Sequence, residues 1–409
     1  MLKINRSVPS FVLVLLLVAC QTAVVKPPAV VIAPTPPVVT TTPAEVKPLN
    51  QKASFKQLDY VDLPGWSQDT LTEAWPAFKS SCKALINKSD WHELCLIAQD
   101  VDGANANAVR VFFEAFFNPY QVINPDGTDT GLITGYYEPL LQGARQRGGR
   151  FQTPLYAAPA DLLTIDMAGL YPELKGMRLR GRVIGNKVEP YPSRAELLKT
   201  GVLKGKEICW VDDSVDAFFL QVQGSGRIYF ADTKQTIRLA YADQNGQPYK
   251  SIGRYLVDKG ELKLEQASAQ GIKNWIAGHP TREDEVLNAN PSYVFFKEEK
   301  LIDPNQGPKG ALGVSLIEKR SVAIDAQFLP LGAPVFINTT EPNSDVPIQR
   351  LMMAQDTGGA IRGAVRADFF WGFGTQAGEM AGRMKQRGML WVLWPKTASA
   401  PLGTIINQH

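Results

Sequence analysis

The 409-residue sequence predicts a mainly β protein with helices, and its strands fit a closed barrel better than a doubly wound sheet. From about residue 130, β-rich runs such as LITGYYEPLL alternate with glycine and proline, and after Pro291 short runs such as APVFINT and MLWVLW follow at barrel-like spacing. The sequence has neither a repeat of fixed period nor a βαβ rhythm. A repeat architecture is therefore not indicated.

Composition excludes several classes of protein. With 44% hydrophobic and 20% charged residues, the chain can bury a core, which excludes wholesale disorder. The 43 Lys+Arg and 40 Asp+Glu leave the chain near neutrality, without the basic footprint of duplex nucleic-acid binding. The three histidines, and four cysteines without a C-x2-C pair, give no signal of a metal site. We therefore expect no nucleic acid, no metal and no cofactor.

Residues 1–19 are typical of a signal peptide. Lys3 and Arg6 provide a basic start, and the apolar run that follows is shorter than the roughly 20 residues that span a membrane. The run ends in Leu-Val-Ala-Cys20, which resembles a bacterial lipobox. The alternative is an ordinary signal peptide with an incidental cysteine.

The lipobox resemblance implies cleavage before Cys20 and lipidation of this cysteine. Gln21 follows where inner-membrane retention would require Asp, so the resemblance implies an outer-membrane lipoprotein that faces the periplasm. Residues 20–49 are rich in Pro, Val, Ala and Thr, which predicts an extended tether between the anchor and the body of the protein.

Residues 50–120 are expected to be helical. Leu71, Trp75, Phe78, Cys82 and Leu85 recur at the spacing of one helix face. Thr70 and Glu73 would form a capping box at its start, and a second helix is expected around Val109 to Phe117.

Cys82 and Cys95 lie in this compact segment of a protein that we expect in the oxidising periplasm. We predict a disulfide between them, which would contribute about 3 kcal/mol to stability in the chain-entropy model. Two buried thiols are the alternative. Cys209 would remain unpaired in the core.

Further helices are expected between the later strands. Ser193 and Glu196 form a second capping-box pattern, and apolar spacing predicts helices near Ile252–Leu256, Ala269–Ile276 and Ala377–Met384. Asn245-Gly246 predicts a tight turn. No segment fits a P-loop, a dinucleotide-binding glycine motif or a nucleophile elbow.

Two aspartates in glycine-rich strand ends are the candidate chemical groups. Asp356 lies in AQDTGGA, and Asp368 follows twelve residues later in RADFFWG. The aromatic residues after Asp368 would desolvate its carboxyl group, raise its pKa and stack on sugar rings. A protonated carboxyl is what glycosidic cleavage requires. Alternatively, both aspartates hold turns and pair with Arg362 or Arg366.

Other glycine- and aromatic-rich segments suit a saccharide groove, and together they resemble the membrane-bound lytic murein transglycosylase A family of Gram-negative bacteria. The resemblance covers roughly residues 55–396, in the right order. The matching segments are Thr134–Pro139, Val222–Gly226, Tyr241–Tyr249, Ser251–Gly253, Asn290–Phe296, Ala354–Gly363 and Ala367–Gly372.

The resemblance implies a lyase-type enzyme of cell-wall turnover. Such enzymes cleave the MurNAc–GlcNAc β-1,4 bond of peptidoglycan strands without water and leave 1,6-anhydro-MurNAc ends. Asp368 would be the single acid/base, and Asp356 would be a supporting carboxylate. The implied substrate-binding residues are Thr134, Tyr136, Tyr137, Gln223, Ser225 and Asn245.

The resemblance also implies a double-psi β-barrel built from discontinuous segments. We place the barrel at residues 50–139 and 290–409. An inserted β-rich domain at residues 140–289 would form the other wall of the groove.

Two readings compete with a transglycosylase. One is a hydrolytic glycosidase that uses both aspartates, for which a carboxyl separation of about 5–9.5 Å is expected. The other is a non-catalytic lipoprotein that only binds the cell wall. The sequence does not reveal partners among the cell-wall synthesis proteins.

Overall fold

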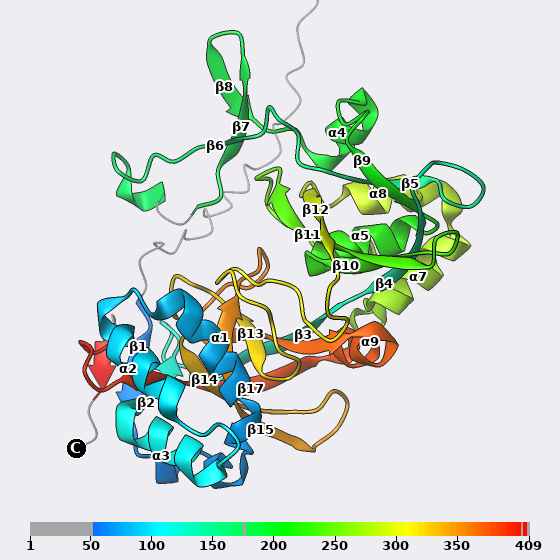
Figure 1. Cartoon of the computed structure of the whole chain (residues 1–409). Helices are drawn as coiled ribbons and strands as arrows, with labels where there is room; N and C mark the ends of the chain where they lie inside the picture. The colour runs from blue at the N-terminus through cyan, green and yellow to red at the C-terminus, as the bar shows by residue number, and fades with distance from the viewer. Residues whose placement is uncertain (1–51, 175–176, 402–403, 407–409) are drawn as a thin grey trace, which may run out of the picture. The chain divides into compact units, whose positions relative to one another are not determined.

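The computed structural model describes residues 52–174, 177–401 and 404–406 (Figure 1). The predicted signal peptide, Cys20 and the predicted tether lie outside the described residues. The main sheet has nine strands in the order β14-β15-β13-β16-β3-β17-β2-β1-β18. Its strands are β1 (Ser54–Gln57), β2 (Phe117–Ile123), β3 (Gly131–Glu138), β13 (Ser321–Ile324), β14 (Pro334–Thr340), β15 (Pro347–Asp356), β16 (Arg366–Phe373), β17 (Lys385–Pro395) and β18 (Thr404–Ile406).

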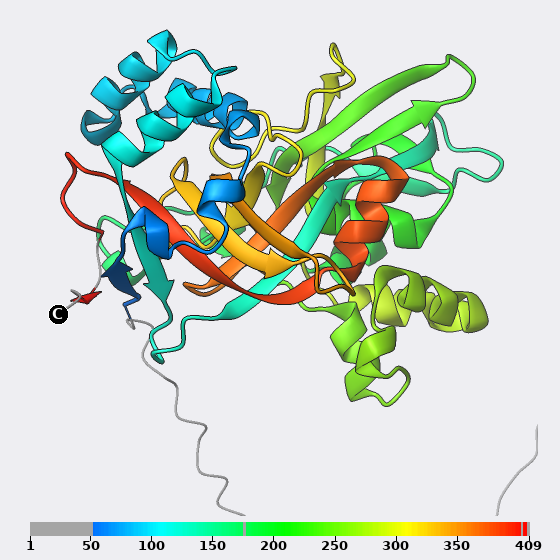
Figure 2. The same cartoon turned by 90° about the horizontal axis from the view of Figure 1, so that it is seen from below.

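The sheet returns on itself because β14 also pairs with β17. The strands β14, β15, β13, β16, β3 and β17 therefore form a ring, which is the barrel that the strand spacing predicts. Figure 2 shows these strands with helix α9 (Gly374–Arg383) beside them, and α9 contacts both β3 and β16. The strands contribute many residues to the main apolar core, among them Ile133, Ala367 and Phe369.

Helices α1 (Trp75–Leu85), α2 (Ser89–Asp100) and α3 (Ala106–Phe116) lie together beside the barrel strands (Figure 1). The predicted apolar face of the first helix is confirmed, since Trp75, Phe78, Cys82 and Leu85 are all buried. A disulfide joins Cys82 and Cys95, whose Cα atoms are 5.3 Å apart.

Two details of this region differ from the sequence expectation. Thr70 makes no side-chain capping bond; Leu71–Glu73 is a short 3-10 turn (η3), and α1 begins only at Trp75. The reason is that the Glu73 carboxylate accepts a hydrogen bond from Arg320, 2.8 Å away, instead of turning back to Thr70. Phe117 begins β2 and does not continue the helix.

A second sheet of six strands is formed by the middle of the chain, in the order β12-β11-β10-β4-β9-β5. The strand β4 begins one residue after Pro139, and β12 still belongs to this sheet, so the sheet extends beyond the predicted end of the insertion at residue 289. Its strands are β4 (Leu140–Ala144), β5 (Thr153–Tyr156), β9 (Glu207–Val211), β10 (Gly226–Phe230), β11 (Gln235–Gln244) and β12 (Val294–Lys300).

The core of this second sheet includes Cys209, which is a free thiol in the structure. Burial raises the pKa of this thiol to about 12. Cys209 is therefore an unreactive apolar residue of the core.

A small third sheet and several helices complete the middle region. The predicted capping box is confirmed at the start of α4, where the Ser193 backbone N–H donates to Glu196, 2.7 Å away. The small sheet contains β6 (Leu163–Thr164), β7 (Arg180–Ile184) and β8 (Lys187–Pro190). The helices are α4 (Arg194–Thr200), α5 (Ser214–Gln223), α6 (Ile252–Asp258), α7 (Ala269–Gly278) and α8 (Glu283–Asn288).

The Asn245-Gly246 pair is not a hairpin turn. The hairpin between β10 and β11 turns instead at residues 231–234, where Lys234 takes a positive φ of 55°. Asn245 follows the last residue of β11, and the chain then leaves the sheet towards α6.

A buried ionic cluster marks the junction of the two large sheets. Glu138, the last residue of β3, has no exposed surface and binds Arg227 of β10 and Arg238 of β11 at 2.8 and 2.5 Å. Both arginines also donate to the backbone carbonyl of Gln306. The cluster therefore fixes the second sheet to the end of a barrel strand.

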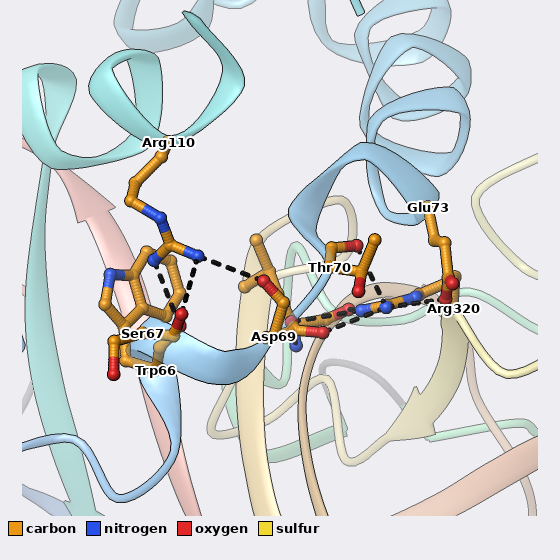
Figure 3. Close-up of polar contacts among 8 residues, drawn as sticks. Trp66, Ser67, Asp69, Thr70, Glu73, Arg110 and Arg320 are labelled. Carbon is orange, nitrogen blue, oxygen red and sulfur yellow. Dashed lines mark hydrogen bonds and ion pairs between the residues drawn. The ribbon is translucent and has the colours of Figure 1, made fainter. Parts of the chain in front are cut away.

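A second buried network ties the segment before α1 to the barrel (Figure 3). Arg320, the residue before β13, donates to both carboxylate oxygens of Asp69, at 3.1 and 2.9 Å. On the other side of the segment, Arg110 of α3 donates to the carbonyl oxygens of Trp66 and Asp69, each at 3.0 Å (Figure 3).

Within the described ranges, the model contains no helix with the length and apolar character needed to cross a membrane. The same ranges contain no group of three or more His, Cys, Asp or Glu side chains placed to hold a metal ion.

Candidate active site

The two candidate aspartates lie in one row across the barrel wall. Asp356 of β15 and Asp368 of β16 each pair with Ala323 of β13, and Asp368 pairs in turn with Thr134 of β3. Residues directly opposite each other on neighbouring strands project from the same face of a sheet, and neighbouring strands are about 4.8 Å apart. The Cα atoms of the two aspartates are therefore about 10 Å apart, with only the methyl group of Ala323 between them.

An apolar cluster lies next to this row. Tyr136 and Phe370 follow Thr134 and Asp368 by two residues and so share their face, with their rings 5.1 Å apart. Leu316 and Ile361 complete the cluster with Ala323. Both carboxyl groups keep part of their surface exposed but are surrounded by protein, so burial raises the pKa of both.

The aromatic residues after Asp368 do not form a sugar-stacking surface. Phe369 and Trp371 point to the opposite face of β16 and belong to the main core, and Phe370 is also buried. Side chains alternate along a strand, so an aspartate and its immediate neighbours cannot share one face. The aromatic residues on the face of Asp368 are instead Phe370 and Tyr136, two positions away on their strands.

Asp356 is surrounded by hydrogen-bond donors. Oδ1 accepts from the backbone N–H groups of Ala311 and Thr357, both at 2.9 Å, and Oδ2 accepts from the Tyr136 hydroxyl at 3.1 Å. Burial raises the pKa of Asp356 to about 6, although these donors oppose the increase. Near neutral pH, Asp356 is therefore mainly a carboxylate with both oxygens already used as acceptors.

Asp368 has a different environment. Its Oδ1 accepts a hydrogen bond from the Thr134 hydroxyl at 2.5 Å, and within the described ranges no donor lies on Oδ2. Burial raises the pKa of Asp368, while the positive charge of Arg366 and the Thr134 hydrogen bond lower it. Oδ2 is therefore the oxygen on which a proton can reside without displacing a donor.

The other predicted groove residues have unequal positions. Tyr136 joins the site through Asp356, whereas Tyr137 points to the opposite face of β3 and packs against Gly378 of α9. Gln223, at the end of α5, accepts a hydrogen bond from the Tyr137 backbone N–H at 3.1 Å. Ser225 follows Gly224, which ends the helix with a positive φ of 82°, and is partly exposed.

Asn245 is not available to a ligand in this structure. Its side chain is only 1% exposed. Its amide nitrogen donates to the carbonyls of Pro192 and Pro291, and its oxygen accepts from the backbone N–H groups of Gln247 and Tyr293. Its amide therefore holds three chain segments together, which is a structural role.

Sequence reasoning missed two contacts at the site. Arg178, two residues before β7, donates to the Thr357 hydroxyl at 3.0 Å and so reaches the residue after Asp356. Arg366 donates to the Thr134 hydroxyl at 2.9 Å and does not form the ion pair with an aspartate that was the alternative expectation. Arg362 lies 3.7 Å from Asp325, away from both candidate aspartates. No local pattern could have found contacts between positions this distant in sequence.

Two cavities lie near the site, and neither includes the candidate aspartates. The first, about 610 Å³, shares Leu316 and Phe370 with the apolar cluster and also contacts Glu138. The second, about 520 Å³, lies on the core-facing side of β16 and is lined by Phe369, Trp371 and Arg350.

The fold and the site define a class of protein. Asp368 has an oxygen without a donor among the described residues, whereas both oxygens of Asp356 accept hydrogen bonds, so the barrel wall carries two candidate carboxyl groups in different hydrogen-bonding environments.

Comparison with known proteins identifies the family. Residues 132–297 match the model of the MltA specific insert domain, and residues 320–394 match the 3D domain. The membrane-bound lytic murein transglycosylase A of Escherichia coli K12 is 37% identical over 287 residues, which cover 68% of this chain and 69% of that protein. The chain belongs to the membrane-bound lytic murein transglycosylase A family.

Solved structures show the same relationship. The crystal structure of MltA from Neisseria gonorrhoeae is similar with a TM-score of 0.72 and 37% identity, covering 84% of this chain and 93% of that chain. The crystal structure of E. coli MltA with bound chitohexaose is similar with a TM-score of 0.64 and 27% identity, covering 84% of this chain and 94% of that chain.

Proposed function

We propose that this protein is a lytic transglycosylase of cell-wall turnover. It cleaves the MurNAc–GlcNAc β-1,4 bond of peptidoglycan strands without water and leaves 1,6-anhydro-MurNAc ends. Family membership supports the substrate class, and so does the chitohexaose bound by the E. coli relative. The single observation that carries the proposal is the unequal hydrogen bonding of Asp356 and Asp368.

In the proposed mechanism, Asp368 acts in both half-reactions. Its Oδ2–H donates the proton to the glycosidic oxygen, the C1–O bond breaks, and GlcNAc leaves as an alcohol. The Asp368 carboxylate then takes the proton of the MurNAc C6 hydroxyl, whose oxygen bonds to C1. The proton returns to Asp368, and no water is consumed. The carboxylate of Asp356 stabilises the positive charge that develops on the sugar between these steps.

Analysis of the products tests this proposal. Digestion of purified sacculi in ¹⁸O-labelled water is expected to give unlabelled muropeptides, each one water lighter than its hydrolysed counterpart. Reducing ends that carry the label would instead identify a hydrolase that uses both aspartates. The separation of their Cα atoms, about 10 Å, leaves room for a water between the carboxyl groups.

We also propose the domain arrangement that the family resemblance implies. The barrel ring would be a double-psi barrel formed by residues 50–139 and 290–409. Residues 140–289 would be an inserted domain that forms the other wall of the groove, with β12 adding one more strand to its sheet. The contact between Arg178 and Thr357 supports a groove that ends at Asp356, because it joins a residue of the insertion to the loop after this aspartate.

We further propose that Cys20 is lipidated and anchors the protein in the outer membrane, facing the periplasm. The lipobox pattern and the proline-rich segment after it support this. Metabolic labelling with a palmitate analogue is expected to label the full-length protein and not the Cys20→Ala variant, and only the wild type should sediment with outer membranes. Wild-type protein recovered unlabelled from the soluble periplasm would contradict the proposal.

A further inference from the structure

We propose that Arg366 is a positioning residue that acts through Thr134 to keep the acidic proton of Asp368 on Oδ2. This inference rests on the proposed role of Asp368 as the acid. It assigns a role to a cation that family membership and the two matched domains leave unassigned.

The geometry is a chain of two hydrogen bonds. Arg366 Nη2 donates to Thr134 Oγ1 at 2.9 Å, and Thr134 Oγ1 lies 2.5 Å from Asp368 Oδ1. A guanidinium can only donate hydrogen bonds, and a hydroxyl has a single proton. Because Arg366 occupies a lone pair of Thr134, the hydroxyl proton is directed to its one remaining neighbour among the described residues, Asp368 Oδ1.

The consequence is a distinction between the two carboxyl oxygens of Asp368. Oδ1 is held as an acceptor, so the transferable proton resides on Oδ2, the oxygen without a donor. Consecutive hydrogen bonds also polarise one another, so the charge of Arg366 strengthens the bond from Thr134 to Asp368. Without Arg366, the hydroxyl could rotate and accept a hydrogen bond from a proton on Oδ1, so that the acidic proton would no longer reside on Oδ2.

The position of Arg366 supports this role. Its side chain is partly buried, and within the described ranges no carboxylate lies within 4.0 Å of its guanidinium, so burial lowers the pKa of this arginine. Nη1 donates to the carbonyls of Leu132 and Ala367 at 3.3 and 2.5 Å, which fixes the guanidinium along the β3–β16 pair. Because no described carboxylate pairs with the Arg366 guanidinium, its positive charge acts mainly on the neighbouring Thr134 and Asp368.

The titratable groups that act on Asp368 come from three strands. They are Asp356 on β15, Tyr136 on β3 and Arg366 on β16 itself. A nearby positive charge lowers a carboxyl pKa, so loss of Arg366 raises the pKa of Asp368. The proposed acid must be protonated, and its activity is lost as the pH rises through this pKa. Loss of Arg366 therefore moves the alkaline decline of activity to higher pH.

The test compares Arg366→Gln, Thr134→Val and the double variant in the full-length protein. Each single variant is expected to shift the alkaline limb of kcat/KM upward by about one pH unit, because each removes an interaction that favours the charged form. We expect kcat to fall by about tenfold in each. The double variant should be no slower than Thr134→Val, because both changes break the same chain. Independent, additive losses would overturn the inference.

We call the hydrogen-bond chain from Arg366 through Thr134 to Asp368 the relay. Conservative and matched variants distinguish loss of the relay from a general disturbance of the structure. Arg366→Lys and Thr134→Ser keep the charge and the hydroxyl and are expected to keep the wild-type alkaline limb. Arg387→Gln is the matched control, because Arg387 also donates to a threonine hydroxyl, that of Thr130, outside the aspartate row. Its pH profile should equal that of the wild type. An equal shift of the alkaline limb of kcat/KM in Arg387→Gln and Arg366→Gln would contradict the relay.

A ¹³C NMR titration of the Asp368 carboxyl, assigned by its loss in Asp368→Asn, separates this inference from the proposed function. A raised pKa in Arg366→Gln supports the relay even if Asp368→Asn remains active, a result that would sink only the proposed function. An unchanged pKa in Arg366→Gln overturns the relay and leaves the role of Asp368 intact.

Discussion

The Asp368→Asn variant is expected to cleave glycan strands at least about 10² to 10⁴ times more slowly than the wild type, the usual cost of losing general acid–base catalysis. The effect should lie at or beyond the upper end of this range because Asp368 serves both half-reactions. Asparagine has nearly the same shape, and its carbonyl oxygen can still accept the hydrogen bond from Thr134. Its amide cannot donate an acidic proton or take one back.

The measurement is the rate of muropeptide release from purified sacculi, together with co-sedimentation of each variant with the sacculi. Binding should survive in Asp368→Asn because the surface of the site is unchanged. Asp356→Asn is the comparison variant and should be less impaired, since its amide oxygen still accepts hydrogen bonds from the Ala311 and Thr357 backbone N–H groups and its NH2 group can donate to the Tyr136 hydroxyl oxygen. Full activity of Asp368→Asn would show that another group supplies the proton.

Local patterns in the sequence predict the elements better than the site. The apolar spacing from Trp75 to Leu85 and the capping box at Ser193 both describe interactions within a few residues, and both are present. The capping box at Thr70 is absent because Glu73 binds Arg320, a residue 247 positions away. A local rule cannot weigh a competing partner from a distant strand.

The candidate site shows the same limit. The residue types around Asp356 and Asp368 indicated carboxyl chemistry, but the row that joins them to Ala323 and Thr134 depends on the order of barrel strands. The alternation of side chains along a strand applies to the β16 segment from its sequence alone, and it would have placed Phe369 and Trp371 on the face opposite Asp368, in the core. The structural role of Asn245 was not readable, because its partners come from three separate segments.

The Asp69→Ala variant is expected to lower the free energy of unfolding by about 3–5 kcal/mol, the usual cost of removing one partner of a buried ion pair. Arg320 is only 3% exposed, and it donates to both carboxylate oxygens of Asp69 (Figure 3). Asp69 also accepts a hydrogen bond from the Leu351 backbone N–H at 2.7 Å. The variant therefore leaves a buried charge and a buried N–H group without this acceptor.

Urea unfolding followed by tryptophan fluorescence measures this loss, and Glu73→Ala is the matched control. Glu73 binds the same guanidinium at 2.8 Å, but its side chain is 61% exposed, so its removal should cost at most about 1 kcal/mol. Equal losses in the two variants would contradict the assignment of the stability to the buried pair. Because Arg320 directly precedes β13, which carries Ala323 between the two aspartates, Asp69→Ala should also lower activity under conditions where the variant remains folded.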